Sequence, residues 1–295
     1  MKQLHSTIDW FANRYRVLLL RRALGRGFEA LRYSKVRPRR RQRFHIVSAQ
    51  RNMGEVALTC LQSVYDQKYP NNLVQHVFID DASTDDTVQL VEAWLRDHPD
   101  HCIEFIHNRD RQGMLANNLK GFQLAEEDSI GIELNGDDWL PDPGVLRFFN
   151  KVYDDDEVWM TFNTLRQTDG TILFQVPPPR ALRNSRAYRS APWMTSHLHT
   201  FRIPLYRLVP AGLLTDPFTG ELWDLSQDMA VYLSMLEMAG DHARHIYRIT
   251  CTYHPHSTSD HIQNEPAQLG AAERIRSLPS CQPLLTLGDD RPESG

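Results

Sequence analysis

The sequence predicts an α/β protein with a mainly parallel sheet that is flanked by helices. Between residues 44 and 134, short apolar segments rich in β-branched residues recur about every 30 residues, with helical apolar spacing between them. This alternation is typical of βαβ units, which build parallel sheets. The four cysteines are widely spaced and include no C-x-x-C pair, so neither a zinc module nor a disulfide framework is expected.

Four strands are expected in this part of the chain, at Phe44–Ser48, Leu73–Ile79, Cys102–His107 and Ser129–Leu134. The first helix is expected to bury an apolar face made of Val56, Cys60, Leu61, Val64 and Tyr65. The second runs from about Asp85 to Arg96, with Ser83 as N-cap and Asp86 as its capping-box partner. The third covers Met114–Glu126. Ligands of such sheets bind beyond the carboxyl ends of the strands.

Changes in composition divide the chain into four segments. They are a basic amphipathic arm at 1–43, the regular α/β half at 44–150, a less regular second half at 151–277, and a polar tail at 278–295. The tail is expected to be disordered. In the second half, Pro177–Arg189 is expected to form a surface connection, and Ser226–Ala239 a helix that ends at Gly240.

The arm and the rest of the chain carry opposite charge. Residues 1–43 contain 13 Lys/Arg and 2 Asp/Glu, whereas the remainder contains 20 and 35. A basic helix with aromatic residues such as Trp10 and Phe11 is able to lie on an anionic membrane surface, and Arg37–Arg43 would add attraction. A disordered leader, or a helix packed against the body, explains the same pattern. The acidic body argues against nucleic acid as the main partner.

No segment of the sequence is expected to cross a membrane. The apolar run Val17–Leu20 is far short of the roughly 20 residues that a bilayer requires. The same region lacks the small-residue cleavage site of a secretory signal. The scattered cysteines, which suggest no disulfide framework, favour a cytoplasmic protein, with peripheral contact at the inner face of a membrane left open.

Two clusters of acidic residues follow strands of the expected sheet. Asp80 and Asp81 follow the second strand, and Asp137 and Asp138 follow the fourth. Adjacent carboxylates at a buried strand end repel each other unless a donor or a cation compensates them. Hard oxygen ligands beside a phosphate suit Mg²⁺ or Mn²⁺, which take few ligands from protein. Each cluster alone is also explained by a polar turn, but two at one sheet edge favour a ligand site.

Five motifs within residues 44–150 resemble family 2 glycosyltransferases in their order and spacing. They are Val47–Asn52, Leu61–Gln67, Asp80–Asp85, Gly113 with Asn117, and Asn135–Asp138. The resemblance implies the GT-A fold and an enzyme that inverts the transferred sugar. It also implies a nucleotide-sugar donor, for which UDP is the family's commonest carrier. The acceptor would be a glycan, a lipid-linked group or a protein, in polysaccharide or glycoconjugate biosynthesis.

The resemblance assigns the donor site position by position. The nucleotide pocket is implied at Ala49, Gln50, Arg51, Asn52, Asp80 and Asp81, where a carboxylate would accept a hydrogen bond from the base. Gly113 and Asn117 match the next donor-binding motif, with Gly113 allowing close approach of the donor. Gly136 is likewise expected to let a ligand approach the backbone.

The resemblance also assigns a metal site. Asp137 matches the last acid of the family's D-x-D motif, which binds the divalent metal that bridges the diphosphate. The first acid of that motif is replaced by Asn135, which is able to bind a ribose hydroxyl or a metal-bound water but brings no charge. Weaker metal binding is therefore expected, and Asp138 either compensates or orients the loop. His254 is a candidate to complete the metal shell, or else an ordinary polar loop residue.

The second half of the chain resembles the family more loosely. Ser226 is expected to cap a helix and to place Asp228 in its first turn, where the helix dipole favours the ionised carboxylate. The resemblance implies Asp228 as the catalytic base, with an ordinary first-turn aspartate as the alternative. Trp193 is able to stack on a sugar, or else belongs to the core or the surface.

The predicted reaction is a direct displacement with inversion. Asp228 takes the proton of the acceptor hydroxyl, while Mn²⁺ or Mg²⁺ on Asp137 neutralises charge on the departing diphosphate. Two alternatives stay open. A nucleotidyltransferase of similar fold is disfavoured because Ala49–Gly54 lacks a Gly-rich loop with a lysine. A non-catalytic or degenerate nucleotide-sugar-binding protein is favoured only by Asn135.

Overall fold

The four expected strands are present and lie in one sheet. They are β1 (Phe44–Gln50), β2 (Val74–Asp80), β3 (Ile103–His107) and β4 (Ile130–Glu133). β1 pairs in parallel with β2 and β4, and β2 pairs in parallel with β3. All seven residues of β1 are buried, because this strand is covered on both faces. The structure, a computed structural model, describes residues 23–100, 102–173, 187–193, 195, 198–255 and 265–287.

The second half of the chain extends the same sheet. Its strands are β5 (Met160–Gln167), β6 (Ile172–Leu173), β7 (His199–Arg202) and β8 (Ala243–Tyr253). The eight strands have the order β3-β2-β1-β4-β7-β5-β6, with β8 paired in parallel with β5. β7 runs antiparallel to both β4 and β5 and so joins the two halves. The predicted mixed, mainly parallel sheet is confirmed.

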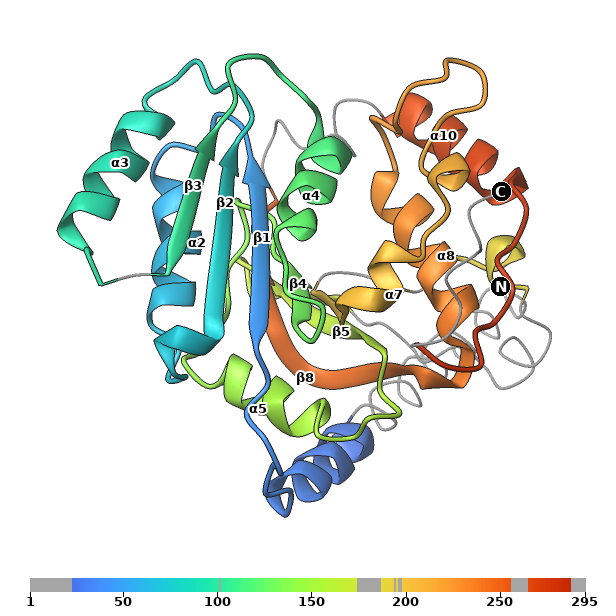
Figure 1. Ribbon diagram of the computed structural model, residues 1–295, viewed down its shortest axis with the longest axis horizontal. Helices are drawn as coiled ribbons and strands as arrows, with labels where there is room; N and C mark the ends of the chain where they lie inside the picture. Colours follow the sequence, from blue (N-terminus) through green and yellow to red (C-terminus); the bar gives the residue numbers. More distant parts are fainter. Residues whose placement is uncertain are drawn as a thin grey trace, which may run out of the picture.

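Helices cover both faces of this sheet (Figure 1). One face carries α2 (Glu55–Tyr65), α3 (Thr87–Asp97) and α5 (Val145–Val152), whose apolar side chains form one core. The other carries α4 (Met114–Gln123), α7 (Ile203–Arg207) and α8 (Gln227–Ala239), with α10 (Glu265–Ser277) beside α8. Neighbouring residues of β1 serve opposite cores, since Ile46 belongs to the first and Val47 to the second.

Two details of the first helices differ from the sequence-based expectation. Tyr65 is 41% exposed, and Ala57 joins the buried face of α2 in its place. α3 begins at Thr87 with Asp86 as its N-cap, whose side chain makes no capping hydrogen bond, while Asp85 accepts a hydrogen bond from the Thr87 N–H at 3.1 Å. Ser83 was the expected cap, but its hydroxyl donates to Asp80 instead. The predicted capping box is therefore wrong, because the turn after β2 competes for the same serine.

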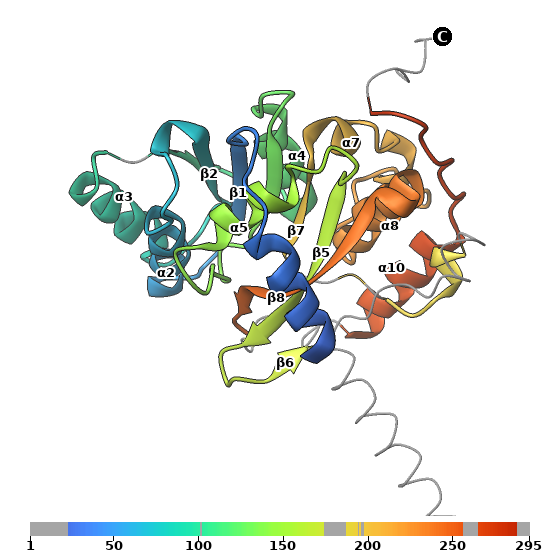
Figure 2. The ribbon, with the colours of Figure 1, turned by 90° about the horizontal axis from the view of Figure 1, so that it is seen from below.

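Helix 23–34, the described part of the basic arm, packs against the rest of the chain. Figure 2 shows this helix, in blue, crossing β8 beside α5. The Glu29 carboxylate accepts hydrogen bonds from the backbone N–H groups of Tyr247 (2.8 Å) and Arg248 (2.7 Å). The alternative of a packed helix therefore applies to these residues, while residues 1–22, with Trp10 and Phe11, lie outside the described part.

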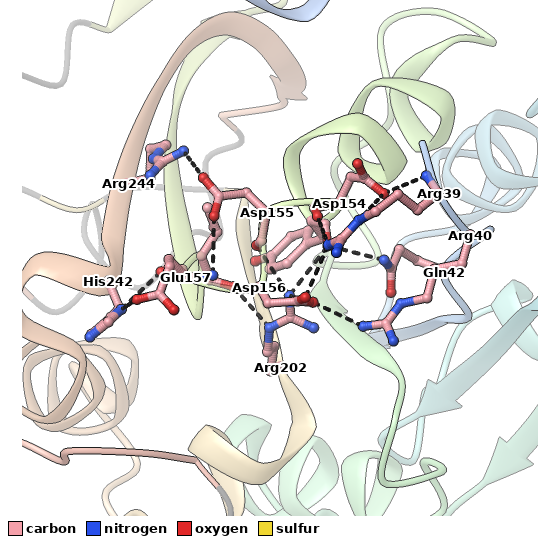
Figure 3. A network of polar contacts seen from close by, with 12 residues as sticks. Arg39, Arg40, Gln42, Asp154, Asp155, Asp156, Glu157, Arg202, His242 and Arg244 are labelled. Atoms are coloured by element: carbon pink, nitrogen blue, oxygen red, sulfur yellow. Dashed lines mark hydrogen bonds and ion pairs between the residues drawn. The ribbon is translucent and has the colours of Figure 1, made fainter. Parts of the chain in front are cut away.

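The basic segment after this helix is largely neutralised by an acidic turn. Figure 3 shows the contacts of Arg39 with Asp154 and Asp156, and of Arg40 with Asp156, at 3.0 Å and 3.1 Å for the two Asp156 pairs. Exposed pairs of this kind contribute little to the stability of the fold. They nevertheless compensate much of the charge at Arg37–Arg43, so this segment offers a membrane less free charge than the sequence predicts.

The end of the chain and the segment before β7 also differ from expectation. Of the expected disordered tail 278–295, residues 278–287 pack on α8, where the Leu284 N–H donates to the Met238 carbonyl at 3.0 Å, and residues 288–295 lie outside the described part. Arg189, expected at the surface, is buried because its guanidinium pairs with Glu237 at 2.8 Å. Most of the predicted connection Pro177–Arg189, including its three prolines, lies outside the described residues.

Candidate functional site

The carboxyl ends of β1, β2 and β4 meet at one edge of the sheet, at the top of Figure 1. Gln50 is aligned with Asp80 in the register of β1 and β2. After β4, the N–H of Gly136 donates to the carbonyl of Ala49 at 3.1 Å. The loops that follow the three strands therefore lie together, which is where parallel sheets bind their ligands.

Asp80 holds the turn after β2. Its fully buried carboxylate accepts hydrogen bonds from Gln50 Nε2 (2.7 Å), from the Ser83 N–H (2.9 Å) and from the Ser83 hydroxyl. The imidazole of His107 lies 3.6 Å from it. Since these donors all come from the chain, the Asp80 side chain fixes Gln50 and the turn in place.

Asp81 organises the loop that leads to α4. Its oxygens accept hydrogen bonds from Asn108 Nδ2 (3.0 Å) and from the backbone N–H groups of Gln112 (2.8 Å) and Gly113 (2.9 Å). Burial raises the pKa of Asp81, but the side chain of Asn117 and these donors outweigh burial, so the pKa lies below its ordinary value. Asp81 is an anion held by a ring of donors.

Gly113 and Asn117 both lie at the start of α4, beside Asp81. Gly113 has a φ of +87°, which residues with a side chain adopt only under strain. A Cβ there would lie 3.6 Å from the Asp224 carboxylate, an ordinary contact, so the backbone conformation is what requires glycine. Asn117 is buried and accepts a hydrogen bond from Asn108 at 2.7 Å. It supports the donor ring around Asp81 from the interior.

Arg51 and Asn52 tie the end of β1 to the turn after β2. Asn52 has a φ of +56° and accepts a hydrogen bond from the Thr84 N–H at 2.8 Å. Arg51 Nε donates to the carbonyl of Ala82 at 3.3 Å. Ala82 itself has a φ of +58°, an uncommon conformation for a residue with a Cβ. Backbone strain of this kind clusters at ligand-binding loops.

The turn Asn135–Asp138 follows β4 and packs against the end of β1. The Asp138 N–H donates to the Asn135 carbonyl at 3.0 Å and closes the turn. Gly136 lies against Gln50, and a Cβ added to it would be 2.5 Å from the Gln50 Cβ. The neighbour that requires glycine here is therefore Gln50, whereas the sequence-based expectation was the approach of a ligand.

Asp138 and His254 meet beside Asp137. Asp138 is fully buried, and its Oδ1 accepts a hydrogen bond from the backbone N–H of His254 at 3.0 Å. Its Oδ2 has no hydrogen-bond partner among the described residues. Burial, and then the charge of Asp137, raises the pKa of Asp138 well above its ordinary value.

This arrangement fits a divalent cation that takes most of its ligands from elsewhere. A buried carboxylate oxygen without a donor, next to a second carboxylate, is stabilised by positive charge. The described residues contain no group of three or more His, Cys, Asp and Glu side chains arranged as a metal site. The protein would therefore supply few ligands, and phosphate and water the others.

Asp228 lies in the first turn of α8, as predicted. Ser226 is the N-cap residue, but its hydroxyl donates to the Gln268 carbonyl at 3.0 Å and caps no N–H of the helix. Asp228 accepts a hydrogen bond from the Met229 N–H at 2.8 Å. The helix ends at Gly240, whose φ is +52°. The predicted helix is confirmed, although its first turn is held by α10 rather than by a side-chain cap.

Glu133, at the end of β4, and Tyr232, on α8, form a buried pair next to Asp228. The Tyr232 hydroxyl donates to the Glu133 carboxylate, and the ring of His199 stacks on Tyr232 with centroids 3.4 Å apart. Burial raises the pKa of Glu133 to about 7, a rise that the Tyr232 hydrogen bond opposes and the charge of Asp228 reinforces. The pair joins α8 to the strand that leads to Asp137.

Comparison with known families accounts for this arrangement. A family model described as glycosyl transferase family 2 matches residues 45–206, more than half of the chain. The chain belongs to glycosyl transferase family 2. The matched segment contains the residues predicted at the ends of β1, β2 and β4, while Asp228 and His254 lie beyond it. No curated protein matches the chain.

Solved structures resemble this family 2 glycosyl transferase in fold. Residues 1–349 of S. aureus TarS, in complex with UDP-GlcNAc, align with a TM-score of 0.56 and 17% identity over 76% of the chain. The chain spans only 61% of that TarS structure. The mannosyltransferase PcManGT from Pyrobaculum calidifontis, in complex with GDP-Man and Mn²⁺, aligns with a TM-score of 0.56 and 20% identity. That alignment covers 92% of this chain and 76% of PcManGT. Both likenesses show the GT-A type of fold.

Other features of the family 2 glycosyl transferase were less visible in the sequence. Trp193 is partly buried against the core that contains α8, which favours its interpretation as a core residue. Asn108 lies in none of the five motifs and carries no motif signal of its own. Glu133 had one, because an acidic residue interrupts an otherwise apolar strand. Among the described residues, no helix is long and apolar enough to cross a bilayer.

Proposed function

We propose that the chain transfers a sugar from a UDP-sugar to an acceptor hydroxyl with inversion. Membership of the family supports glycosyl transfer, and the structures with UDP-GlcNAc and GDP-Man support a nucleotide-sugar donor. One observation carries the proposal. Glu133 of β4 accepts a hydrogen bond from Tyr232 of α8, the helix whose first turn contains Asp228, and β4 continues into the turn of Asp137 and Asp138. This contact supports a base and a cation site that lie near the same strand end.

In this proposal the donor binds over the ends of β1 and β2. The wall of the pocket would be formed by Ala49, Gln50, Arg51, Asn52, Gly113, Asn117, Asn135 and Gly136. Asp80 and Asp81 shape it, because both carboxylates already accept hydrogen bonds from the chain. A carboxylate offers about four lone-pair sites, so Asp81 retains capacity to accept a hydrogen bond from the base.

Asp137 and Asp138 would hold Mn²⁺ or Mg²⁺, and His254 would support Asp138 through its backbone N–H. When bound, such an ion offsets negative charge on the diphosphate. The donor-free Oδ2 of Asp138 supports a cation there, and the Mn²⁺ in the PcManGT structure supports a metal of this class. Asn135 adds an oxygen but no charge, so we expect a modest affinity for the ion.

Asp228 acts as the general base in this mechanism. Its carboxylate takes the proton of the acceptor hydroxyl, and the freed oxygen attacks the anomeric carbon on the face opposite to the diphosphate. The bond from the anomeric carbon to the diphosphate oxygen breaks as the new bond forms, which inverts the configuration. We propose a glycan, lipid-linked or protein acceptor, and a cytoplasmic location.

Release of UDP from UDP-sugars in the presence of Mn²⁺ tests the proposal. Asp137→Ala is expected to lower kcat at least about 100-fold, because a metal contributes several kcal/mol of transition-state stabilisation. Asp228→Asn removes the base and is expected to lower kcat about 100- to 10,000-fold. Asp97→Asn, on the exposed end of α3, is the matched control and should leave kcat unchanged.

Three results would contradict this proposal. Equal turnover in Asp137→Ala and the control would remove the metal role. Binding of a UDP-sugar by wild type, seen as a thermal shift without turnover, would favour the non-catalytic binder that Asn135 suggests. Synthesis of a nucleotide-sugar from a sugar phosphate and UTP would favour a nucleotidyltransferase.

A further inference from the structure

Helix 23–34 exposes a continuous apolar stripe. Leu24, Phe28 and Leu31 are 59%, 70% and 55% exposed. Their spacing of four and then three residues places them on one side of the helix. Large apolar side chains grouped in this way on a surface mark a contact with another apolar phase.

The opposite side of the helix is fixed, so the stripe cannot turn inward. Gly25 lies against Tyr247, where an added Cβ would be 2.6 Å from the ring. Glu29 is bound by two backbone N–H groups of β8. Tyr33 is buried and packs edge-on against Phe148 of α5, with ring centroids 5.2 Å apart.

A basic groove follows the same helix. A hollow of about 750 Å³ lies between helix 23–34 and α5, and an adjoining hollow of about 500 Å³ shares three of its lining cations, Lys68, Arg147 and Lys151. Arg41 lines the second hollow. The two hollows therefore form one run of positive charge beside the apolar stripe.

The acids in this groove neutralise Arg248 but form no ion pair with three other described cations of its lining. The Glu29 carboxylate accepts hydrogen bonds from two backbone N–H groups of β8. Asp142 accepts two hydrogen bonds, of 2.7 and 2.8 Å, from Arg248. Exposed Arg41, Lys68 and Arg147 form no ion pair with another described residue. Free cations at a surface with no free acid attract an anionic partner.

Stripe and groove lie at the end of the molecule opposite to the donor edge. Figure 1 shows helix 23–34, in blue, and α5 at the bottom, whereas the loops after β1 and β2 are at the top. An anionic bilayer matches both features, because its headgroup phosphates suit the cations and its acyl chains suit the apolar stripe. A surface of another protein would match the stripe but would have to supply a concentrated negative charge as well.

We propose that this end of the molecule is a docking face for anionic bilayers. Leu24, Phe28 and Leu31 enter the boundary between headgroups and acyl chains. Arg41, Lys68 and Arg147 contact lipid phosphates. The face combines Arg41 of the N-terminal arm with Lys68 and Arg147 of the folded body, and it is independent of the donor chemistry.

Flotation of the full chain with vesicles tests the face. Wild type should bind vesicles of phosphatidylcholine with phosphatidylglycerol and should lose binding when phosphatidylglycerol is omitted or salt is raised. Leu24→Gln/Phe28→Gln/Leu31→Gln should weaken binding at least about tenfold. Arg41→Gln/Lys68→Gln/Arg147→Gln should weaken it about 100-fold, at about fivefold per cation. Phe218→Gln is the matched control, because Phe218 is 81% exposed and its loop is tied by the Asp216–Arg274 ion pair to α10, which lies away from helix 23–34 (Figure 1).

Thermal unfolding and UDP-sugar turnover should be unchanged in both triple variants, which separates this proposal from the proposed function. Three outcomes would overturn the docking face: no binding of wild type to anionic vesicles, equal binding by the triple variants, or binding that depends only on residues 1–22. A wild-type dimer that the apolar triple variant converts to a monomer, without vesicle binding by either, would assign the stripe to a second copy of the chain.

Discussion

The ends of β2 and β4 place carboxyl groups at the same edge of the sheet but hold them in opposite states. After β2, Asp81 accepts three hydrogen bonds and its pKa lies below the ordinary value. At β4, burial raises the pKa of Glu133 to about 7 and that of Asp138 well above its usual range. All three side chains are buried, so the supply of N–H donors decides the charge.

The two strand ends therefore differ in whether the chain itself satisfies the hydrogen-bonding needs of their carboxyl groups. The β2 end has its negative charge compensated by the chain itself, and it needs no ligand to be stable. After β4, the Oδ2 of Asp138 has no donor within the part of the chain that the structure describes, so a cation or a proton stabilises it. Neutralising a carboxylate should therefore destabilise the protein at β2 and should cost little, or even stabilise it, at β4.

Asp81→Asn should produce the largest change in stability. The amide nitrogen of asparagine would face an N–H donor that now bonds a carboxylate oxygen, so a buried charge-assisted hydrogen bond is lost and a donor is left unpaired. We expect a loss of about 3 kcal/mol in the free energy of unfolding. The melting temperature should fall by roughly 5–10 °C. Calorimetry beside the Asp97→Asn control, which should change by less than about 0.5 kcal/mol, would measure it.

Glu133→Gln should have a smaller effect that depends on pH. The carboxyl group has its pKa raised from 4.5 to about 7 on folding, so its stabilising protonated form is complete below pH 4.5 and is lost as pH rises through 7. Glutamine still accepts from Tyr232 and does not titrate. As pH rises from 5.5 to 8, the free energy of unfolding of the variant should therefore increase by about 2 kcal/mol relative to that of wild type.

Urea unfolding of both proteins at the two pH values would measure this gain. Tyr232→Phe is the matched variant, because it removes the hydroxyl that donates to Glu133 and should steepen the loss of stability with pH. A difference between Glu133→Gln and wild type that is the same at both pH values would show that Glu133 ionises normally.

The same contrast explains how much the sequence could predict. The strands of the first half follow from apolar periodicity, and the positions of Asp80, Asp81 and Asp137 follow from motif spacing, because both signals are local in the chain. The partners of these acids were not predictable. Asn108, which donates to Asp81, follows β3. His254, whose backbone N–H donates to the neighbouring Asp138, is 116 positions away from it in the chain.

The second half was predicted less well for a related physical reason. Arg189 is buried only because Glu237 and the 278–287 segment arrive from other parts of the chain. Ser83 and Ser226 had the residue type of helix caps, but each hydroxyl finds a tertiary partner instead. Local propensity is a weak guide where polar side chains have long-range partners.

Asp138→Asn should change the free energy of unfolding of the metal-free protein least, so it tests the contrast between the ends of β2 and β4 most closely. Asparagine keeps an oxygen to accept the His254 N–H, and the atom it replaces has no hydrogen-bond partner among the described residues. Removing a buried carboxyl group whose pKa is raised should change the free energy of unfolding by no more than about 1 kcal/mol, with a gain more expected than a loss.

The metal gives this variant a second readout. In wild type, Mn²⁺ at about 100 times its Kd should add about 2.7 kcal/mol to the free energy of unfolding. Asp138→Asn should lose most of that increment, because it removes the donor-free oxygen next to Asp137, whereas Asp81→Asn should retain it. If Mn²⁺ stabilised both variants equally, the unsatisfied carboxylate at β4 would not be a cation site, and the two strand ends would differ only in how well the chain fills their hydrogen bonds.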